Sequence, residues 1–201
     1  SVSCIYGLGS PEAYFGMLQL FEKDVEEPLD EILKQLAKMQ YERPHLDLAP
    51  GSFRIRGDSL EIYPPYDDTA VRISLWGDQV ESIERIDPVR GKKLEELDRL
   101  PIYPRTHYVT PRSQLLKAIE SIRAELDPRL VELNDAGKLL EAQRLGQRTN
   151  FDLEMLTELG YCSGIENYSR HLTGRRQGEP PPTLLDYFPH DFLCIIDESH
   201  V

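Results

Sequence analysis

Residues 52–86 read SFRIRGDSLEIYPPYDDTAVRISLWGDQVESIERI and decide the fold of the first half of the chain. Apolar and polar residues alternate here with a period of two, which is typical of strands that bury one face. The alternating stretches are 53–56, 60–63, 71–76 and 80–86. Gly57-Asp58 and Gly77-Asp78 suit two-residue hairpin turns between neighbouring strands. The pattern therefore predicts an antiparallel meander with one apolar and one polar face.

Two short helices are predicted before this meander. Ser10 precedes Pro11-Glu12, as an N-cap precedes a proline at the first helical position. A second helix follows Pro28, because the apolar residues after it keep helical spacing. These residues are Leu29, Ile32, Leu33, Leu36 and Met39. Packed on the apolar face of the sheet, the two helices would complete a small α+β domain that ends near residues 101–104.

The second half of the chain predicts a helical hairpin. Thr110 is the expected N-cap of its first helix, and Pro128 is expected to kink that helix. The break falls at residues 135–137, and the second helix runs from about Lys138 to Glu158. The apolar stripe of the first helix consists of Leu115, Leu116, Ile119, Ile122, Leu126, Leu130 and Leu133.

Composition excludes several classes of protein. The 201 residues carry 23 basic and 35 acidic side chains, a formal charge of -12, and 40% are hydrophobic, as in a globular domain rather than a disordered tail. No apolar run approaches the roughly 18 residues that a membrane span needs. The acidic balance argues against coating nucleic acid by bulk charge and leaves room for a local basic site.

The arginines of the first domain are grouped. Arg43, Arg54, Arg56 and Arg72 fall on or beside the first predicted strands. Arg54 and Arg56 are two residues apart on one strand, so their side chains are expected on the same face.

The cysteines and the single tryptophan are predicted to be buried. Cys4, Cys162 and Cys194 are far apart and lack the C-x-x-C spacing of metal or redox motifs, which predicts reduced thiols that pack in the core. Trp76 is expected in the core with the aromatic residues of the sheet.

Strands are predicted at both ends of the chain. Residues 1–6 read as a strand in mid-course, and the apolar run 192–196 is of the kind found in buried parallel strands. Because charged residues follow that run at once, we expect the chain to be a piece of a longer protein. Asp197 could hold Mg²⁺ beside nucleotide phosphates, and Glu198 could orient or deprotonate the attacking water.

These last residues form the motif Asp197-Glu198-Ser199-His200, and D-E-x-H is the nucleotide-hydrolysis motif of superfamily-two helicases. The sequence contains no G-x-x-x-x-G-K-[ST] loop that would cradle a phosphate. Hydrolysis of ATP by this chain alone is therefore not expected.

Several stretches together resemble the UvrB family, the helicase-like damage-verifying subunits of bacterial UvrABC nucleotide-excision-repair systems. They are residues 3–11, 141–149, 162–171, 184–189 and the Asp-Glu-Ser-His end. The resemblance extends over the whole chain, and the stretch 162–171 (CSGIENYSRH) is highly specific.

The resemblance implies an α+β fold class, with an antiparallel sheet and helices, a helical subdomain and strands of a truncated P-loop helicase core. The implied regions are the tail of the first core region (1–14), a UvrA-binding domain (15–104), a helical subdomain near DNA (105–190) and a core strand with the Walker-B motif (191–201).

The resemblance also gives the arginine cluster a role. Family members dock on UvrA through a polar, charged surface, whose interface positions are matched by Arg43, Arg54, Arg56 and Arg72. Guanidinium groups suit such an interface because they bind carboxylates in a bidentate manner. The family commonly has Glu two residues after the last of these arginines, where this chain has Ser74. The alternative is that these arginines are ordinary solvated strand residues.

A second set of positions resembles those that the family places near DNA. Arg148 would hold a phosphate, Glu166 would pair with basic residues of a hairpin that this sequence lacks, and Arg170 would lie beside them. Asn167 and Tyr168 could line the same channel. The histidines show no metal-ligand spacing, which favours core or surface roles.

For the intact protein, the resemblance implies a cytoplasmic ATP- and Mg²⁺-dependent enzyme that UvrA loads on damaged DNA before UvrC incises. For this chain it implies binding of UvrA, with no bound cofactor and no membrane partner. Two alternatives stay open. One is a non-enzymatic UvrA-binding module like that of a transcription-repair coupling factor, and the other is an unrelated helicase insert without affinity for UvrA.

Overall fold

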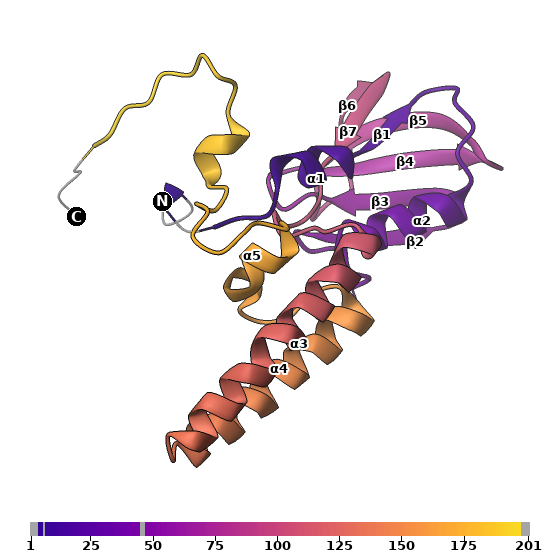
Figure 1. The fold of residues 1–201 in the computed structure, drawn as a ribbon. Coiled ribbons are helices and arrows are strands. Elements are labelled where there is room, and N and C mark those ends of the chain that lie inside the picture. Colours follow the sequence, from indigo (N-terminus) through magenta and orange to yellow (C-terminus); the bar gives the residue numbers. More distant parts are fainter. Residues whose placement is uncertain (1–3, 6, 45–46, 198–201) are drawn as a thin grey trace.

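The computed structural model describes residues 4–5, 7–44 and 47–197. A sheet domain and a protruding pair of long helices make up most of it (Figure 1). The elements in chain order are α1 (Pro11–Gly16), β1 (Gln19–Glu22), α2 (Leu29–Lys38), β2 (Ser52–Arg56), β3 (Ser59–Tyr63), β4 (Ala70–Trp76), β5 (Gln79–Ile86), β6 (Lys93–Leu97), β7 (Arg99–Ile102), α3 (Arg112–Asp135), α4 (Leu139–Leu159), η2 (Ile165–Tyr168), α5 (Ser169–Leu172) and η3 (Leu184–Tyr187).

The predicted meander is confirmed. Strands β2 to β6 form an antiparallel sheet in sequence order, and β1 pairs with β7 in a second, two-stranded sheet. We call residues 19–102 the sheet domain. The alternation of residues did not predict β1, β6 or β7. Strand β6 reads KLEEL and exposes most of its side chains, so it lacks the period of two that marks a strand with one buried face.

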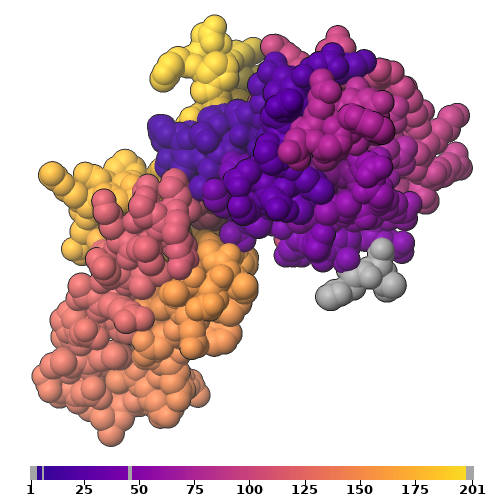
Figure 2. All heavy atoms as spheres, turned by 90° about the vertical axis from the view of Figure 1, so that its right-hand side faces the viewer, coloured from indigo at the N-terminus to yellow at the C-terminus, as the bar shows by residue number. Residues whose placement is uncertain are grey.

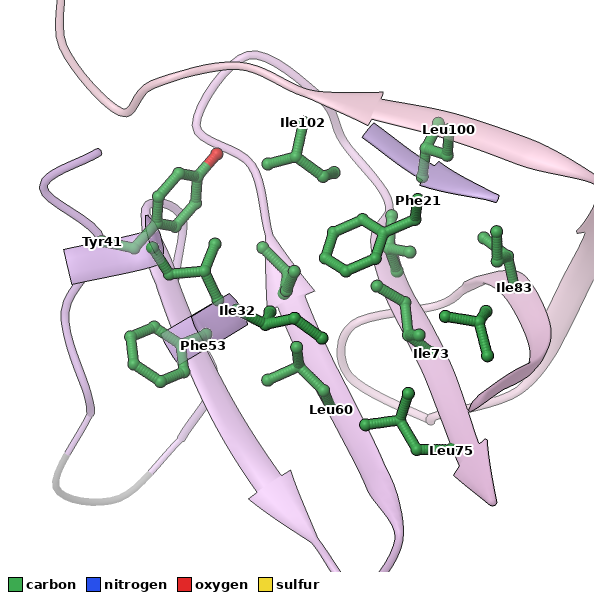
Figure 3. Packing of buried hydrophobic residues seen from close by; sticks show 14 of the residues in the cluster. Phe21, Ile32, Tyr41, Phe53, Leu60, Ile73, Leu75, Ile83, Leu100 and Ile102 are labelled. Carbon is green, nitrogen blue, oxygen red and sulfur yellow. The ribbon is translucent and has the colours of Figure 1, made fainter. Parts of the chain in front are cut away.

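The core of the sheet domain lies between one face of the larger sheet, helix α2 and the two-stranded sheet. Phe21 of β1 and Ile73 of β4 are fully buried, and α2 contributes Ile32 and Leu36 (Figure 3). The predicted second helix is thus confirmed. Because β1, α2 and β4 are separate segments of the chain, this core forms only when they pack together.

Helix α1 differs from its prediction. Ser10 caps it, since its hydroxyl accepts a hydrogen bond from the backbone N–H of Ala13, but no residue of α1 is buried in the sheet core. Instead Tyr14 stacks on His107 and Tyr103, with ring centroids 4.9 and 6.0 Å away. The segment of α1 is six residues long and has no apolar stripe to place on the sheet.

Helices α3 and α4 form the predicted helical hairpin, which extends away from the sheet domain (Figure 2). Of the predicted stripe, Leu116 and Leu130 are not buried. The first helix begins at Arg112, with Pro111 rather than Thr110 as its N-cap, and it continues through Pro128 to Asp135. The carbonyl of Ala124 loses its helical donor at this proline, but Ala124 is exposed, so water can bind the carbonyl.

The strand predicted at residues 192–196 is absent from the structure. Residues 192–197 have no regular secondary structure, and Leu193, Ile195 and Ile196 are 75 to 85% exposed. A strand needs a hydrogen-bonded neighbour, and among the described residues none lies beside this segment. Of the strand predicted at residues 1–6, the structure describes only Cys4 and Ile5, and neither is in a strand.

Two predictions of burial are wrong. Trp76 is 78% exposed at the end of β4, because its position in the alternation places it on the polar face of the sheet. Cys194 is exposed within residues 192–197, and Cys4 is half-buried. Cys162 is buried as predicted, and burial raises the pKa of its thiol to about 11.

None of the helices in the described part of the chain is long and apolar enough to cross a membrane.

Candidate functional site

The face of the larger sheet that points away from the core is polar. On β4, Val71, Ile73 and Leu75 are buried, whereas Arg72 and Ser74 between them are partly exposed. The same alternation places Arg54 and Arg56 of β2 together on this side, as the sequence predicted. We call this side of strands β2 to β5 the polar face.

Charged side chains of alternating sign cross the polar face in one row. The strand register places Arg54 opposite Glu61, Glu61 opposite Arg72, and Arg72 opposite Glu84. Arg54 Nε donates a hydrogen bond of 2.6 Å to one Glu61 oxygen, and Arg72 Nη2 donates one of 2.8 Å to the other. We call this row the charge ladder.

The charge ladder continues onto β6. Lys93 Nζ lies 2.9 Å from a Glu84 oxygen and 2.7 Å from a Glu96 oxygen. Lys93 and Glu96, at this end of the ladder, are 45 and 48% exposed, so their contacts add little stability compared with the pairs that Glu61 makes.

Glu61 is the most buried charged group of the ladder, with 1% of its side chain exposed. Burial by itself would raise the pKa of its carboxyl group. Hydrogen bonds from Arg72 and Arg54 favour the charged form more strongly, so the pKa is lowered. Glu61 thus stays ionised at neutral pH and holds Arg54 and Arg72 in fixed positions.

The four predicted partner-binding arginines therefore fall into two kinds. Arg54 and Arg72 are partly buried and bound to Glu61, so neither is an ordinary solvated strand residue. Arg43 and Arg56 are exposed. The guanidinium carbon of Arg43 lies 6.0 Å from the ring centroid of Phe53.

Ser74 belongs to a second row of the polar face. Arg56, Ser59, Ser74 and Ser82 are neighbours across four strands. The Ser59 and Ser74 hydroxyl oxygens are 3.5 Å apart. At position 74 the resemblance predicts Glu, and this chain has the shorter Ser. Arg56 therefore projects beside a row of small polar groups.

In the helical region, Arg148 donates a hydrogen bond to an acidic residue that the sequence pattern did not indicate. Its Nε donates a hydrogen bond of 3.0 Å to Asp152, one helical turn further on, and its Nη2 donates one of 2.8 Å to the carbonyl of Ser163. Asp152 is buried and also accepts a hydrogen bond from the Tyr168 hydroxyl. Burial, and then this hydrogen bond, raise the pKa of Tyr168 to about 12.

Arg170 and Glu166 lie on the segment that follows α4. Arg170 contacts Glu125 of α3, and His171 Nε2 lies 2.7 Å from the same carboxylate. Burial and the nearby Arg170 lower the pKa of His171, so its imidazole is neutral at pH 7. Glu166 is exposed on η2. The structure thus binds Arg148 and Arg170 to different carboxylates, Asp152 and Glu125, rather than to one another.

A cavity of about 220 Å³ opens between α3, α4 and this segment. Asn167, Tyr168 and His171 line it, together with Glu125 and Arg129. Two of the residues predicted near a DNA channel, Asn167 and Tyr168, thus share one hollow, whereas Arg148, Glu166 and Arg170 do not line it.

The structure describes only one of the three residues that are predicted to serve hydrolysis of ATP in the intact protein. Asp197 is exposed beside residues without regular structure, and Glu198 and His200 lie outside the described residues. A single exposed carboxylate without a phosphate-binding loop does not fit Mg²⁺ and a nucleotide. Within the described ranges, no group of three or more His, Cys, Asp and Glu side chains could hold a metal ion.

The fold and these sites define a class: an interaction domain built on an antiparallel sheet, joined to a helical domain. Comparison with known proteins agrees. The sequence profile of the UvrB interaction domain matches residues 20–108, and that of the UvrB third helical domain matches residues 113–174.

The whole chain is similar to proteins named UvrABC system protein B. It is 54% identical to the protein of Dehalococcoides mccartyi strain CBDB1, 53% to that of Thermobifida fusca strain YX and 54% to that of Legionella pneumophila strain Corby. All of this chain is aligned, and it spans about 30% of the length of these relatives. The chain belongs to the UvrB family.

Proposed function

We propose that this chain binds the UvrA subunit of a nucleotide-excision-repair system through the polar face of its sheet domain. The observation that carries the proposal is the exposed guanidinium group of Arg56 on this face, beside Arg54 and Arg72, within the region that matches the UvrB interaction domain. Arg43 is also exposed, but it lies at the edge of β2 near Phe53, which faces the core. The UvrABC name of the relatives supports the choice of partner.

The arrangement of charges favours a partner that offers carboxylates. Glu61 is shared by Arg54 and Arg72, so one negative charge faces two positive ones at the centre of the ladder. With Arg56, the arginines on this part of the polar face outnumber Glu61 and Glu84, on a chain whose formal charge is -12. Arginine suits this role because its planar group binds a carboxylate through two hydrogen bonds.

Titration of purified UvrA tests the proposal. The variant Arg56→Glu should weaken binding about tenfold or more, and the remaining affinity should depend less on salt, because an attractive charge has become repulsive. Arg99→Glu is the matched control, since Arg99 is an exposed arginine on β7 in the other sheet. Equal loss of affinity in both variants, or unchanged affinity in Arg56→Glu, would contradict the proposal that UvrA binds the polar face.

For the intact protein, we propose damage verification in the cytoplasm, with hydrolysis of ATP in the presence of Mg²⁺, loading on damaged DNA by UvrA and later recruitment of UvrC. The family membership supports this proposal. The residues of this chain would supply the partner-binding and helical regions, and Asp197, Glu198 and His200 would serve the hydrolysis of ATP in the intact protein.

DNA contact by the helical region is a second proposal. Arg148 is 59% exposed although Asp152 orients it, so a phosphate can reach its outer face. Arg170 and the exposed Glu166 lie on the neighbouring segment. Anisotropy of labelled single-stranded DNA tests this proposal: Arg148→Ala should weaken binding and reduce its salt dependence, whereas Arg144→Ala, at an exposed position on the same helix, should not.

The two alternatives are less well supported. A UvrB-like module of a transcription-repair coupling factor would also bind UvrA, but the compared proteins are UvrABC system protein B along the whole chain. An unrelated helicase insert would have no affinity for UvrA, and the same titration would show it.

A further inference from the structure

The single tryptophan of the chain lies on the polar face without being covered. Trp76 is the last residue of β4, and 78% of it is exposed. Strand β4 buries Leu75 on the core side, so Arg72, Ser74 and Trp76 all project to the other side. With a rise of about 3.3 Å per residue, Trp76 lies about 13 Å along the strand from Arg72.

Such exposure is unusual for this side chain. Aromatic side chains bury about 150–250 Å² each when covered, and tryptophan is enriched among the residues that dominate protein interfaces. Other large apolar side chains are exposed in the sheet domain, but none of them lies on β2 to β5. Leu20 belongs to the other sheet and Leu94 to β6, and the remaining three, Val25, Tyr66 and Val89, lie outside the strands. Trp76, on β4, shares the polar face with Arg54, Arg56 and Arg72.

The neighbourhood of Trp76 suits an anchor. The row formed by Ser59, Ser74 and Ser82 has short side chains, so a partner surface can approach the backbone between the charge ladder and the indole ring. On one side of these serines lie the charges of the ladder, and on the other lies one large apolar ring. A complementary surface would present carboxylates and, beside them, an apolar pocket.

We propose that Trp76 is the aromatic anchor of the polar face and inserts into an apolar pocket, flanked by carboxylates, on the UvrA subunit. This inference rests on the proposed function and adds to it the apolar contact that arginines alone do not supply. The ionic contacts orient the partner, and burial of the indole slows its dissociation.

The single tryptophan makes a direct test possible. The chain is labelled with 5-fluorotryptophan, which introduces fluorine at Trp76 alone, and unlabelled UvrA is added. We expect the fluorine resonance to shift and its sensitivity to the exchange of H₂O for D₂O to disappear. If UvrA binds, as measured separately by sedimentation, and the resonance keeps its position and solvent sensitivity, the proposal is overturned and the proposed function stands.

A variant completes the test. Trp76→Ala should weaken UvrA binding about tenfold or more, and Trp76→Phe should restore part of the affinity. Leu139→Ala is the matched control, because Leu139 is a 66% exposed apolar residue in the helical hairpin, and it should leave the affinity unchanged. Equal effects of the two alanine variants would overturn the proposal.

Two further outcomes distinguish failure of this inference from failure of the proposed function. If the parent chain has no affinity for UvrA, the proposed function fails and the anchor fails with it. If the fluorine resonance shifts as the concentration of the chain alone is raised, the indole contacts a second copy of the chain, and the proposal of a UvrA anchor is overturned.

Discussion

The sheet domain and the helical hairpin bury their apolar residues in different ways. The core of the sheet domain extends from Phe21 to Ile102 and contains residues of α2 and of all seven strands, with β6 contributing the partly buried Leu97. In the helical region, the main cluster lies near the sheet domain, between Leu115 of α3 and Leu156 of α4. Toward the tip, Val131 and Leu139 are 58 and 66% exposed. The sheet domain should therefore unfold as one unit, whereas the tip of the hairpin can open alone.

The largest expected difference comes from a core substitution in each region. Phe21 is fully buried, so Phe21→Ala should lower the free energy of unfolding by about 3–5 kcal/mol. Leu133, near the tip, is 8% exposed, and Leu133→Ala should cost less because the neighbouring side chains can relax into water. Urea unfolding measures both. A loss in Leu133→Ala as large as that in Phe21→Ala would show that the two regions unfold together.

A smaller effect is expected from the centre of the charge ladder. Glu61→Gln should cost about 1–3 kcal/mol at pH 7, because Arg54 and Arg72 lose a charged acceptor but are themselves partly solvated. Glu81→Gln is the control, since Glu81 is exposed on β5. The helical region has no comparable row of charges, so hydrogen exchange should increase only in the sheet domain.

The effect of Glu61 should also depend on pH. The folded-state pKa of Glu61 is lowered, so its stabilising contribution is present above the unfolded-state pKa of about 4.3 and is lost as the pH falls through the folded value. The difference in unfolding free energy between the parent chain and Glu61→Gln should thus be largest near neutral pH and shrink in acid. A difference that stays constant down to pH values of about 3 would contradict the role of its charge.

The smallest effect is expected from one glycine substitution in each region. Gly57, between β2 and β3, and Gly137, at the hairpin tip, both have positive φ angles, of 58° and 72°, and a Cβ at either would have no neighbour within 4 Å. Alanine at each should cost about 1 kcal/mol of backbone strain. In Gly57→Ala this cost should lower the stability of the whole sheet domain. In Gly137→Ala it should increase amide exchange at the tip alone, and faster exchange in the sheet domain would contradict this expectation.

The sequence predicted those elements whose pattern is local. The alternation in residues 53–86 and the helical stripe of α3 were readable because each buries one face. The two-residue turn at Gly57-Asp58 also places Arg54 opposite Glu61, so this half of the ladder could have been found. The contact of Arg72 with Glu61 could not, because a longer connection joins β3 to β4 and leaves their register open.

Other features were not predicted correctly, because they depend on contacts with distant segments or because a residue type was misleading. Residues 192–196 are apolar, but an apolar run becomes a strand only beside another strand. Trp76 was assigned to the core because of its type, although its place two residues after Ser74 puts it on the polar side. Burial of Asp152 beneath Arg148 and Tyr168 depended on the position of the segment after α4, which no local pattern indicates.

The charge ladder also has an evolutionary consequence. Each inner member touches two neighbours of opposite sign, so reversing one charge would create two repulsive contacts at once. A reversal at the position of Glu61 would be tolerated only after both flanking arginines had changed. Among relatives, these positions should therefore vary as a linked set rather than singly, and a lineage that had exchanged the whole set would need a partner that had exchanged its own charges.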